Sequence, residues 1–143
     1  MTMRRLLGTI AVLLVLAGCG SESQVTVSPS LEDSTVRLVS ATAGGGAPAN
    51  HATDVTDDAA LASYVGQFSA GFADDVTAAA GSMDVGDGEV LVAQVVSIGC
   101  DKPLDAEVRA TKSGVAMVPT PVPSPRRECF APVTTVGLAV VPA

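Results

Sequence analysis

The segment from Glu89 to Ile98, EVLVAQVVSI, constrains the fold more than any other part of the chain. It is an almost unbroken run of valine, leucine, isoleucine and alanine. A strand with one wet face alternates apolar and polar residues, whereas a run of this kind is typical of a strand covered on both faces. We therefore expect residues 89–98 to form the centre of a sheet with other elements packed on either side.

Further strands are expected at both ends of this domain. Residues 34–41 show a modest alternation, with Val36 and Leu38 as the apolar positions, and residues 129–143 form a long apolar stretch near the carboxyl terminus. Prolines fall at every second position from 119 to 125. Such spacing removes the amide donors from one edge of an extended segment, which favours a protected sheet edge or a stiff loop. A polyproline ligand for an aromatic groove is the alternative.

A hairpin is expected between these strands. In residues 104–112 the small or apolar Ala106, Val108 and Ala110 alternate with charged or polar residues, which predicts one buried and one wet face. Ser113-Gly114 is a two-residue turn signal, so residues 115–118 should return as the partner strand.

Residues 53–81 change to a helical period. Thr56 can cap a helix whose first turn holds Asp57 and Asp58. Its apolar side chains recur at i, i+3, i+4 and i+7: Leu61, Tyr64, Val65 and Phe68. A second short helix, stopped by Gly81, carries Phe72, Val76 and Ala79 or Ala80 on one face. The sequence thus predicts an α+β fold, a small mostly antiparallel sheet with two short helices inserted after the first strand.

The amino terminus has the layout of a secretory signal. Arg4 and Arg5 precede 13 residues without charge, Leu6 to Gly18, which end in small residues. As a helix at about 1.5 Å per residue the apolar run would reach roughly 20 Å, which is short of the ~30 Å needed to span a bilayer. A cleaved export signal is therefore expected rather than a permanent transmembrane helix.

Leu16-Ala17-Gly18-Cys19 resembles the lipobox of bacterial lipoprotein precursors, in which a leucine and two small residues precede a cysteine. The resemblance implies that Cys19 receives a diacylglyceryl group as a thioether and that a signal peptidase cuts between Gly18 and Cys19. Two acyl chains anchor a protein stably in a membrane. We therefore expect a signal peptide at 1–18, a flexible tether at 19–33 and a single domain at 34–143, held on the extracytoplasmic side of the cell membrane. An ordinary cleaved signal with a chance cysteine is the alternative.

The number of cysteines is consistent with this division. The chain has three, and if Cys19 carries lipid, Cys100 and Cys129 remain as a pair. Outside the cytoplasm thiols are oxidised, so we expect a disulfide that closes a loop of 29 residues. Two free buried thiols are the alternative, and the absence of any CxxC spacing disfavours a metal site.

Charge and composition disfavour several partners. Removal of residues 1–18 would take away two arginines and leave 6 basic and 15 acidic residues, a net charge of −9. Nucleic acid and anionic head groups would repel such a chain, so no nucleic-acid partner is expected.

No residues stand out as catalytic or metal-binding, and no cofactor is implied. The one histidine, His51, lies in a loop rich in glycine and proline, and the pairs at 57–58 and 74–75 look like charges on solvated helix surfaces. The carboxylates at 84, 87 and 89 have the wrong spacing for a helix-loop-helix calcium site, which favours a plain turn. Whether His51 or the acidic clusters form a site is left open by the sequence.

From Thr35 to Pro142 the order of elements resembles small bacterial lipoprotein domains and, more distantly, the PrcB-type C-terminal domain. That domain is an accessory module of an extracytoplasmic protease complex, so the resemblance implies a non-catalytic binding role beside another envelope protein. The family's Pro-Thr-Gly-Gly-Tyr turn is replaced here by Asp101-Lys102-Pro103-Leu104-Asp105. A small extracytoplasmic hydrolase or ligand-capturing domain is the alternative, and a passive spacer is a third possibility.

Overall fold

The computed structural model describes residue 31 and residues 34–143. The expected signal peptide and nearly all of the expected tether lie outside this part of the chain. The described elements are six strands and two helices, which run in the order β1 (Arg37–Thr42), β2 (Thr53–Asp54), α1 (Asp58–Val65), α2 (Ala70–Gly81), β3 (Glu89–Gly99), β4 (Ala106–Thr111), β5 (Gly114–Pro119) and β6 (Val133–Pro142). The predicted α+β class is confirmed.

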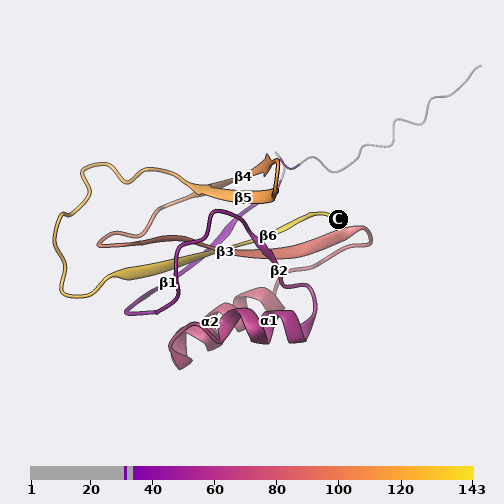
Figure 1. Cartoon of the computed structure of the whole chain (residues 1–143), viewed down its shortest axis with the longest axis horizontal. Coiled ribbons are helices and arrows are strands. Elements are labelled where there is room, and N and C mark those ends of the chain that lie inside the picture. The colour runs from indigo at the N-terminus through magenta and orange to yellow at the C-terminus, as the bar shows by residue number, and fades with distance from the viewer. Residues whose placement is uncertain (1–30, 32–33) are drawn as a thin grey trace, which may run out of the picture.

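The strands form two sheets. One has the order β1-β6-β3-β2 with every neighbouring pair antiparallel, and the other is the β4–β5 hairpin. Figure 1 shows the hairpin on one face of the larger sheet and both helices on the opposite face. The domain therefore has three layers, and the larger sheet is the middle one.

Strand β3 lies inside this middle sheet, as its apolar sequence predicts. It pairs with β6 along ten positions and with β2 on its other side. Its alternate side chains serve different layers, because successive residues of a strand point to opposite faces. Leu91 and Val95 join the cluster on the helix side, whereas Val92 joins the cluster under the hairpin.

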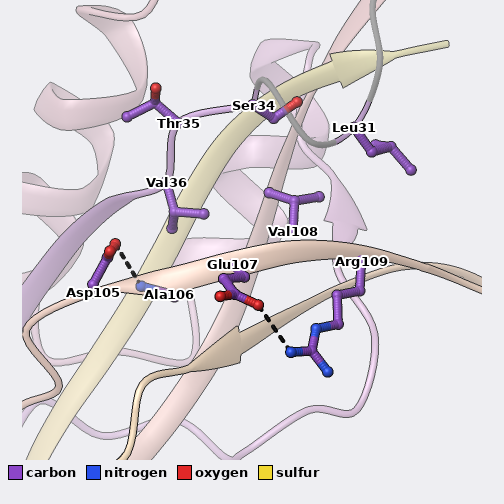
Figure 2. A pocket seen from close by; sticks show the side chains of 9 residues that line it. All are labelled: Leu31, Ser34, Thr35, Val36, Asp105, Ala106, Glu107, Val108 and Arg109. Carbon is purple, nitrogen blue, oxygen red and sulfur yellow. Dashed lines mark hydrogen bonds and ion pairs between the residues drawn. The ribbon is translucent and has the colours of Figure 1, made fainter.

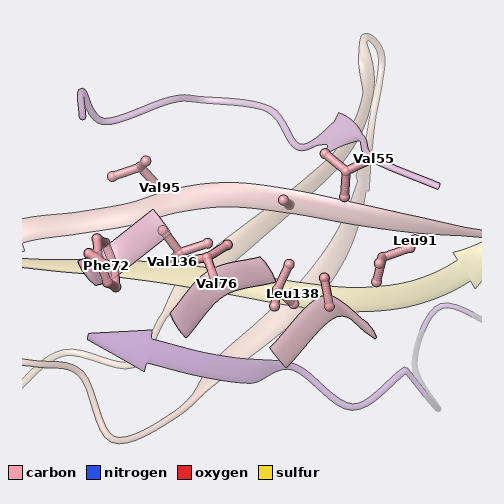
Figure 3. Close-up of a cluster of buried hydrophobic side chains, with 9 residues drawn as sticks. Val55, Phe72, Val76, Leu91, Val95, Val136 and Leu138 are labelled. Carbon is pink, nitrogen blue, oxygen red and sulfur yellow. The ribbon is translucent and has the colours of Figure 1, made fainter. Parts of the chain in front are cut away.

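The helix-side core is built around Phe72 and Val76 of α2, which are 2% and 0% exposed. Figure 3 shows these side chains against the inward-facing residues of the sheet. The buried members of the cluster are Val55, Phe72, Val76, Ala80, Leu91, Ala93, Val95, Val136 and Leu138. The stripe predicted for residues 61–68 packs against this core, and Phe68 contacts both Tyr64 and Phe72 edge to face. Burial of these side chains is the main force holding the helices on the sheet.

The hairpin-side core depends on a close approach at Gly137 of β6. A Cβ at this position would lie 2.6 Å from Met117 Sδ and 3.2 Å from both Val36 Cγ1 and Val96 Cγ1. Only glycine leaves room for Met117, which is 2% exposed and is the largest buried side chain of the hairpin. The missing side chain therefore lets β5 dock closely on the sheet.

Gln94 joins the middle layer to the hairpin. Its side chain extends from β3 and is 4% exposed. Its Oε1 accepts a hydrogen bond from the Met117 N–H at 2.7 Å, and its Nε2 donates to the carbonyl oxygens of Ala49 at 2.8 Å and Met117 at 3.3 Å. A buried amide of this kind is tolerated because its polar atoms have partners.

Several local expectations are corrected. Asp57, not Thr56, is the N-cap of α1, and its carboxylate accepts from the Ala60 N–H at 2.8 Å. Helix α1 ends at Val65, so Phe68 lies in the connection to α2. The two-residue strand β2 had no sequence signal, and its pairing with β3 holds the chain before α1.

The hairpin and the last strand also differ in detail from expectation. The turn residues are Lys112 and Ser113, and Gly114 opens β5 with a φ of 122°, a conformation that favours glycine. Ala110 is exposed, although Ala106 and Val108 are buried as expected. Strand β6 begins at Val133, so Cys129 precedes this strand rather than opening it.

Candidate functional site

A groove of about 600 Å³ runs between strand β4 and the segment that leads into β1. Figure 2 shows its two walls. One wall comes from Leu31 and from residues 34–36, and the other from residues 105–109. The two walls are far apart in the sequence, and the packing of the hairpin on the sheet brings them together.

The groove combines an apolar interior with a charged rim. Val108 is 8% exposed and packs in the same cluster as the partly buried Val36. Because side chains alternate along a strand, Glu107 and Arg109 project to solvent, where they form an ion pair of 2.8 Å. Exposed ion pairs of this kind contribute little to stability. The charged pair is therefore available to a ligand at little structural cost.

Asp105 lies directly before β4 and lines the groove. Its Oδ1 accepts a hydrogen bond from the Ala106 N–H at 2.8 Å, which is drawn in Figure 2. Its carbonyl oxygen accepts from the Thr120 N–H at 2.9 Å. These two contacts fix the direction in which the chain enters the hairpin.

A second hollow of about 290 Å³ continues along the same side of the hairpin. It lies between Leu38 and Ser40 of β1 and residues 102–104. Leu104, one of its lining residues, is 84% exposed. The two hollows together border residues 102–109 on the side that faces β1.

Cys100 and Cys129 lie at disulfide distance, as expected, with Cα atoms 5.4 Å apart and the sulfur atoms bonded. Cys100 directly follows β3 and Cys129 lies four residues before β6. The bridge therefore closes the base of the segment that contains the hairpin. Phe130, next to the bridge, is fully exposed.

An ion pair next to the disulfide holds the proline-rich segment. The Arg126 Nε donates to Asp101 Oδ1 at 2.7 Å, the Arg126 backbone N–H donates to Oδ2 at 2.6 Å, and the guanidinium also donates to the Cys100 carbonyl at 2.8 Å. The hydrogen bonds from Arg126 lower the pKa of Asp101 from its ordinary value. The segment from 120 to 132 is a loop, as one of the two interpretations of its prolines expects.

The other candidate groups from the sequence are spread over the surface. His51 is exposed in the loop before β2, Asp57 and Asp58 are exposed at the start of α1, and Asp74 and Asp75 are exposed on α2. Asp84 and Asp87 belong to the turn before β3, as expected. Glu89 is the first residue of β3, and its Oε2 accepts from the Gly86 N–H at 2.8 Å. The structure brings none of these described groups into the groove.

Two titrating groups have environments with a clear physical cause. Hydrogen bonds from the Thr56 hydroxyl and backbone N–H lower the pKa of Asp54. Burial raises the pKa of Tyr64, whose hydroxyl has no hydrogen-bond partner among the described residues. Within residue 31 and residues 34–143, no group of three or more histidine, cysteine or acidic side chains is placed to hold a metal ion.

Cys19 and Gly18, the expected lipidation and cleavage residues, lie outside the described part of the chain. No helix within that described part is long and apolar enough to cross a bilayer.

The groove residues Asp105, Glu107 and Arg109 were not singled out by the sequence analysis. The alternation of residues 104–112 indicated that Glu107 and Arg109 face solvent. Nothing in the sequence indicated that Leu31 and residues 34–36 would lie opposite them.

No family model, curated protein or solved structure matches this chain.

Proposed function

We propose that the chain is a membrane-anchored extracytoplasmic lipoprotein whose domain is a non-catalytic binding or accessory module for another envelope protein. The anchor is a diacylglyceryl group on Cys19. Cleavage between Gly18 and Cys19 makes Cys19 the first residue of the mature chain. The Cys100–Cys129 pair is oxidised in that compartment.

The groove beside β4 is the observation that carries the binding role. It is about 600 Å³ in volume, within the size range of ligand sites, and combines apolar walls with a few charged groups. Such a surface recognises a partner by shape complementarity and by hydrogen bonds or ion pairs. The groove also lies directly after the expected tether.

The chemistry of the rim favours binding over catalysis. Glu107 is solvated and already paired with Arg109, whereas a general acid or base is tuned by burial or by unbalanced neighbouring charges. The Asp105 carboxylate is occupied by the amide of Ala106. Both acids therefore act as recognition or structural groups.

The anchor is tested by mass spectrometry of the chain expressed in a bacterium that processes lipoproteins, with Cys19→Ser as the matched variant. We expect the wild-type chain to begin at Cys19 and to carry a diacylglyceryl mass, and the variant to carry none. An unmodified wild-type chain that still contains Met1 would refute the anchor.

The accessory role is tested by crosslinking in intact cells of the native host. An unrelated lipoprotein of similar abundance serves as the control. We expect one protein partner to be recovered repeatedly above that control. A set of crosslinked proteins that matches the control set would refute the accessory role and leave the anchor untouched.

A further inference from the structure

The two edges of the β4–β5 hairpin are treated differently by the fold. On the β5 edge the Met117 N–H donates to Gln94 Oε1 at 2.7 Å, and the Val115 carbonyl accepts from the Ala52 N–H at 2.8 Å. The backbone groups that β5 directs away from β4 are therefore those of Val115 and Met117. The Val115 carbonyl and both groups of Met117 are paired within the domain.

The hairpin register then identifies the outward groups of β4. Val115 lies opposite Ala110, and Met117 lies opposite Val108. In an antiparallel ladder, two directly opposed residues both direct their backbone groups towards each other or both direct them outward. Ala110 and Val108 therefore direct their N–H and C=O groups away from β5.

The position of Pro119 supports this assignment. It lies opposite Ala106, at a position where a missing N–H removes nothing from the ladder. The Ala106 N–H is accordingly free to donate to the Asp105 carboxylate.

The free edge of β4 lies beside the groove. Within residue 31 and residues 34–143, the outward N–H and C=O groups of Val108 and Ala110 have no hydrogen-bond partner. Val108 itself lines the groove, opposite residues 34–36. Figure 2 shows β4 running past this open space. An open strand edge is a template for a further strand, and folded proteins usually cover or block such edges.

The charges beside this edge define the occupant. Among the described residues that line the groove, Asp105 and Glu107 are acidic and only Arg109 is basic. The whole chain has a net charge of −7. Complementary charge steers a partner to such a surface and sets its register. The groove walls contribute valine and leucine side chains, which fit every second residue of an extended segment.

We propose that the free edge of β4 binds a cationic, extended segment of an envelope protein as an added strand. Main-chain hydrogen bonds to Val108 and Ala110 would give affinity, and alternate apolar side chains would enter the groove. This inference rests on the accessory role proposed above and names the kind of segment that the module recognises.

The binding test uses the chain from residue 19 onward with Cys19→Ser, which cannot be lipidated. The probe is a capped heptapeptide of alternating lysine and valine, and the matched control peptide replaces lysine with glutamate. Isothermal titration at low and physiological salt measures both. We expect the lysine peptide to bind at least about tenfold more tightly, with affinity falling as salt rises. Equal affinity for the two peptides would overturn the proposal.

Ala110→Pro is the decisive variant, and Ala110→Thr is its matched control. Ala110 is exposed, and proline removes only its outward amide, so the β4–β5 ladder stays intact. Circular dichroism should show both variants folded. We expect Ala110→Pro to bind the lysine peptide about tenfold or more weakly than wild type, and Ala110→Thr to bind it with an affinity within about twofold of wild type. Proline without effect would overturn the proposal.

Reversal of a rim charge gives a second measurement that does not depend on proline. Glu107→Lys should weaken binding of the lysine peptide about tenfold, because the glutamate is exposed at the rim of the groove. Unchanged affinity in this variant would overturn the role of charge in the proposal.

Two other occupants are distinguished by the same material. A dimer in light scattering that Ala110→Pro dissociates would overturn the proposal in favour of a second copy. Slow hydrogen exchange of the Val108 and Ala110 amides in the free chain would overturn it as well, because the edge would then already be paired by the chain's own residues.

Crosslinking in cells separates the two proposals. If wild type recovers a partner and Ala110→Pro recovers it equally well, strand addition is wrong and the accessory role stands. If wild type recovers no specific partner, the accessory role itself is wrong.

Discussion

Replacement of Gln94 tests whether a single buried amide couples the hairpin to the sheet. Gln94→Leu keeps the size of the side chain but leaves the buried Met117 N–H without its acceptor. An unsatisfied buried donor costs about 1–3 kcal/mol, and burial of the leucine offsets roughly 1 kcal/mol of the lost hydrogen bonds. The carbonyl oxygens of Ala49 and Met117 also lose a donor, which costs roughly 1 kcal/mol more, so we expect the free energy of unfolding to fall by about 2 kcal/mol in total.

Gln94→Glu adds a pH dependence whose sign follows from the same contacts. A carboxylate can accept from the Met117 N–H, but its other oxygen would face the carbonyl oxygens of Ala49 and Met117. Burial and these carbonyls favour the neutral acid, so the folded-state pKa is raised above the unfolded value of about 4.3. Stability is then highest below pH ~4.3, falls as the pH rises towards the raised pKa, and is constant above it.

The assay is urea unfolding followed by circular dichroism at pH 4 and pH 7, with the disulfide intact. The loss of stability in Gln94→Glu should exceed that of Gln94→Leu at pH 7 and fall below about 1 kcal/mol at pH 4, where the acid can both donate and accept. Gln67→Glu is the matched control, because Gln67 is exposed and its change should stay within about 0.5 kcal/mol. A Gln94→Glu variant whose loss is the same at both pH values would refute the reasoning.

Three further substitutions probe the layers separately. Gly137→Ala should lower stability by about 1–2 kcal/mol in urea unfolding, because the new methyl group overlaps the buried Met117. Tyr64→Phe should raise stability by up to about 1 kcal/mol, because it removes a buried hydroxyl that has no hydrogen-bond partner among the described residues. Titration of wild type at 295 nm should show this tyrosine, the only one in the sequence, ionising above its ordinary pKa of about 10. Cys100→Ser should lower stability by about 3–4 kcal/mol on the loop-entropy estimate, measured against oxidised wild type, and an equal loss on adding reductant to wild type should accompany it.

The middle layer could be predicted from the sequence because its signal is local. Residues 89–98 are apolar at both odd and even positions, so they require cover on both faces, and the structure supplies helices on one face and a hairpin on the other. The spacing of residues 61–68 and 72–80 likewise indicated which helical side chains face the core. Sequence periodicity is enough to predict whether a side chain is buried or exposed, and these positions required no more than that.

Details that depend on distant residues could not be predicted. Thr56 and Asp57 are both good capping residues, and the choice falls on Asp57 because the Thr56 hydroxyl accepts from the Leu91 N–H at 2.9 Å and donates to Asp54. The groove could not be predicted either, because its position also depends on residues that are far apart in the sequence. Val36 and Val108 meet only because Gly137 admits Met117 and so fixes where the hairpin lies.

The position of the disulfide connects the stability of the fold to its candidate site. The β3–β6 ladder ends at the pair Gly99 and Val133, and the chain between these residues contains the whole hairpin and one wall of the groove. The ladder itself is long and buried, so it does not need the bridge to hold its register. The hairpin is attached to the sheet by one edge, through β5 and Gln94. The bridge between Cys100 and Cys129 shortens the free chain at the base of this attachment, and it thereby keeps the open edge of β4 in place beside residues 34–36.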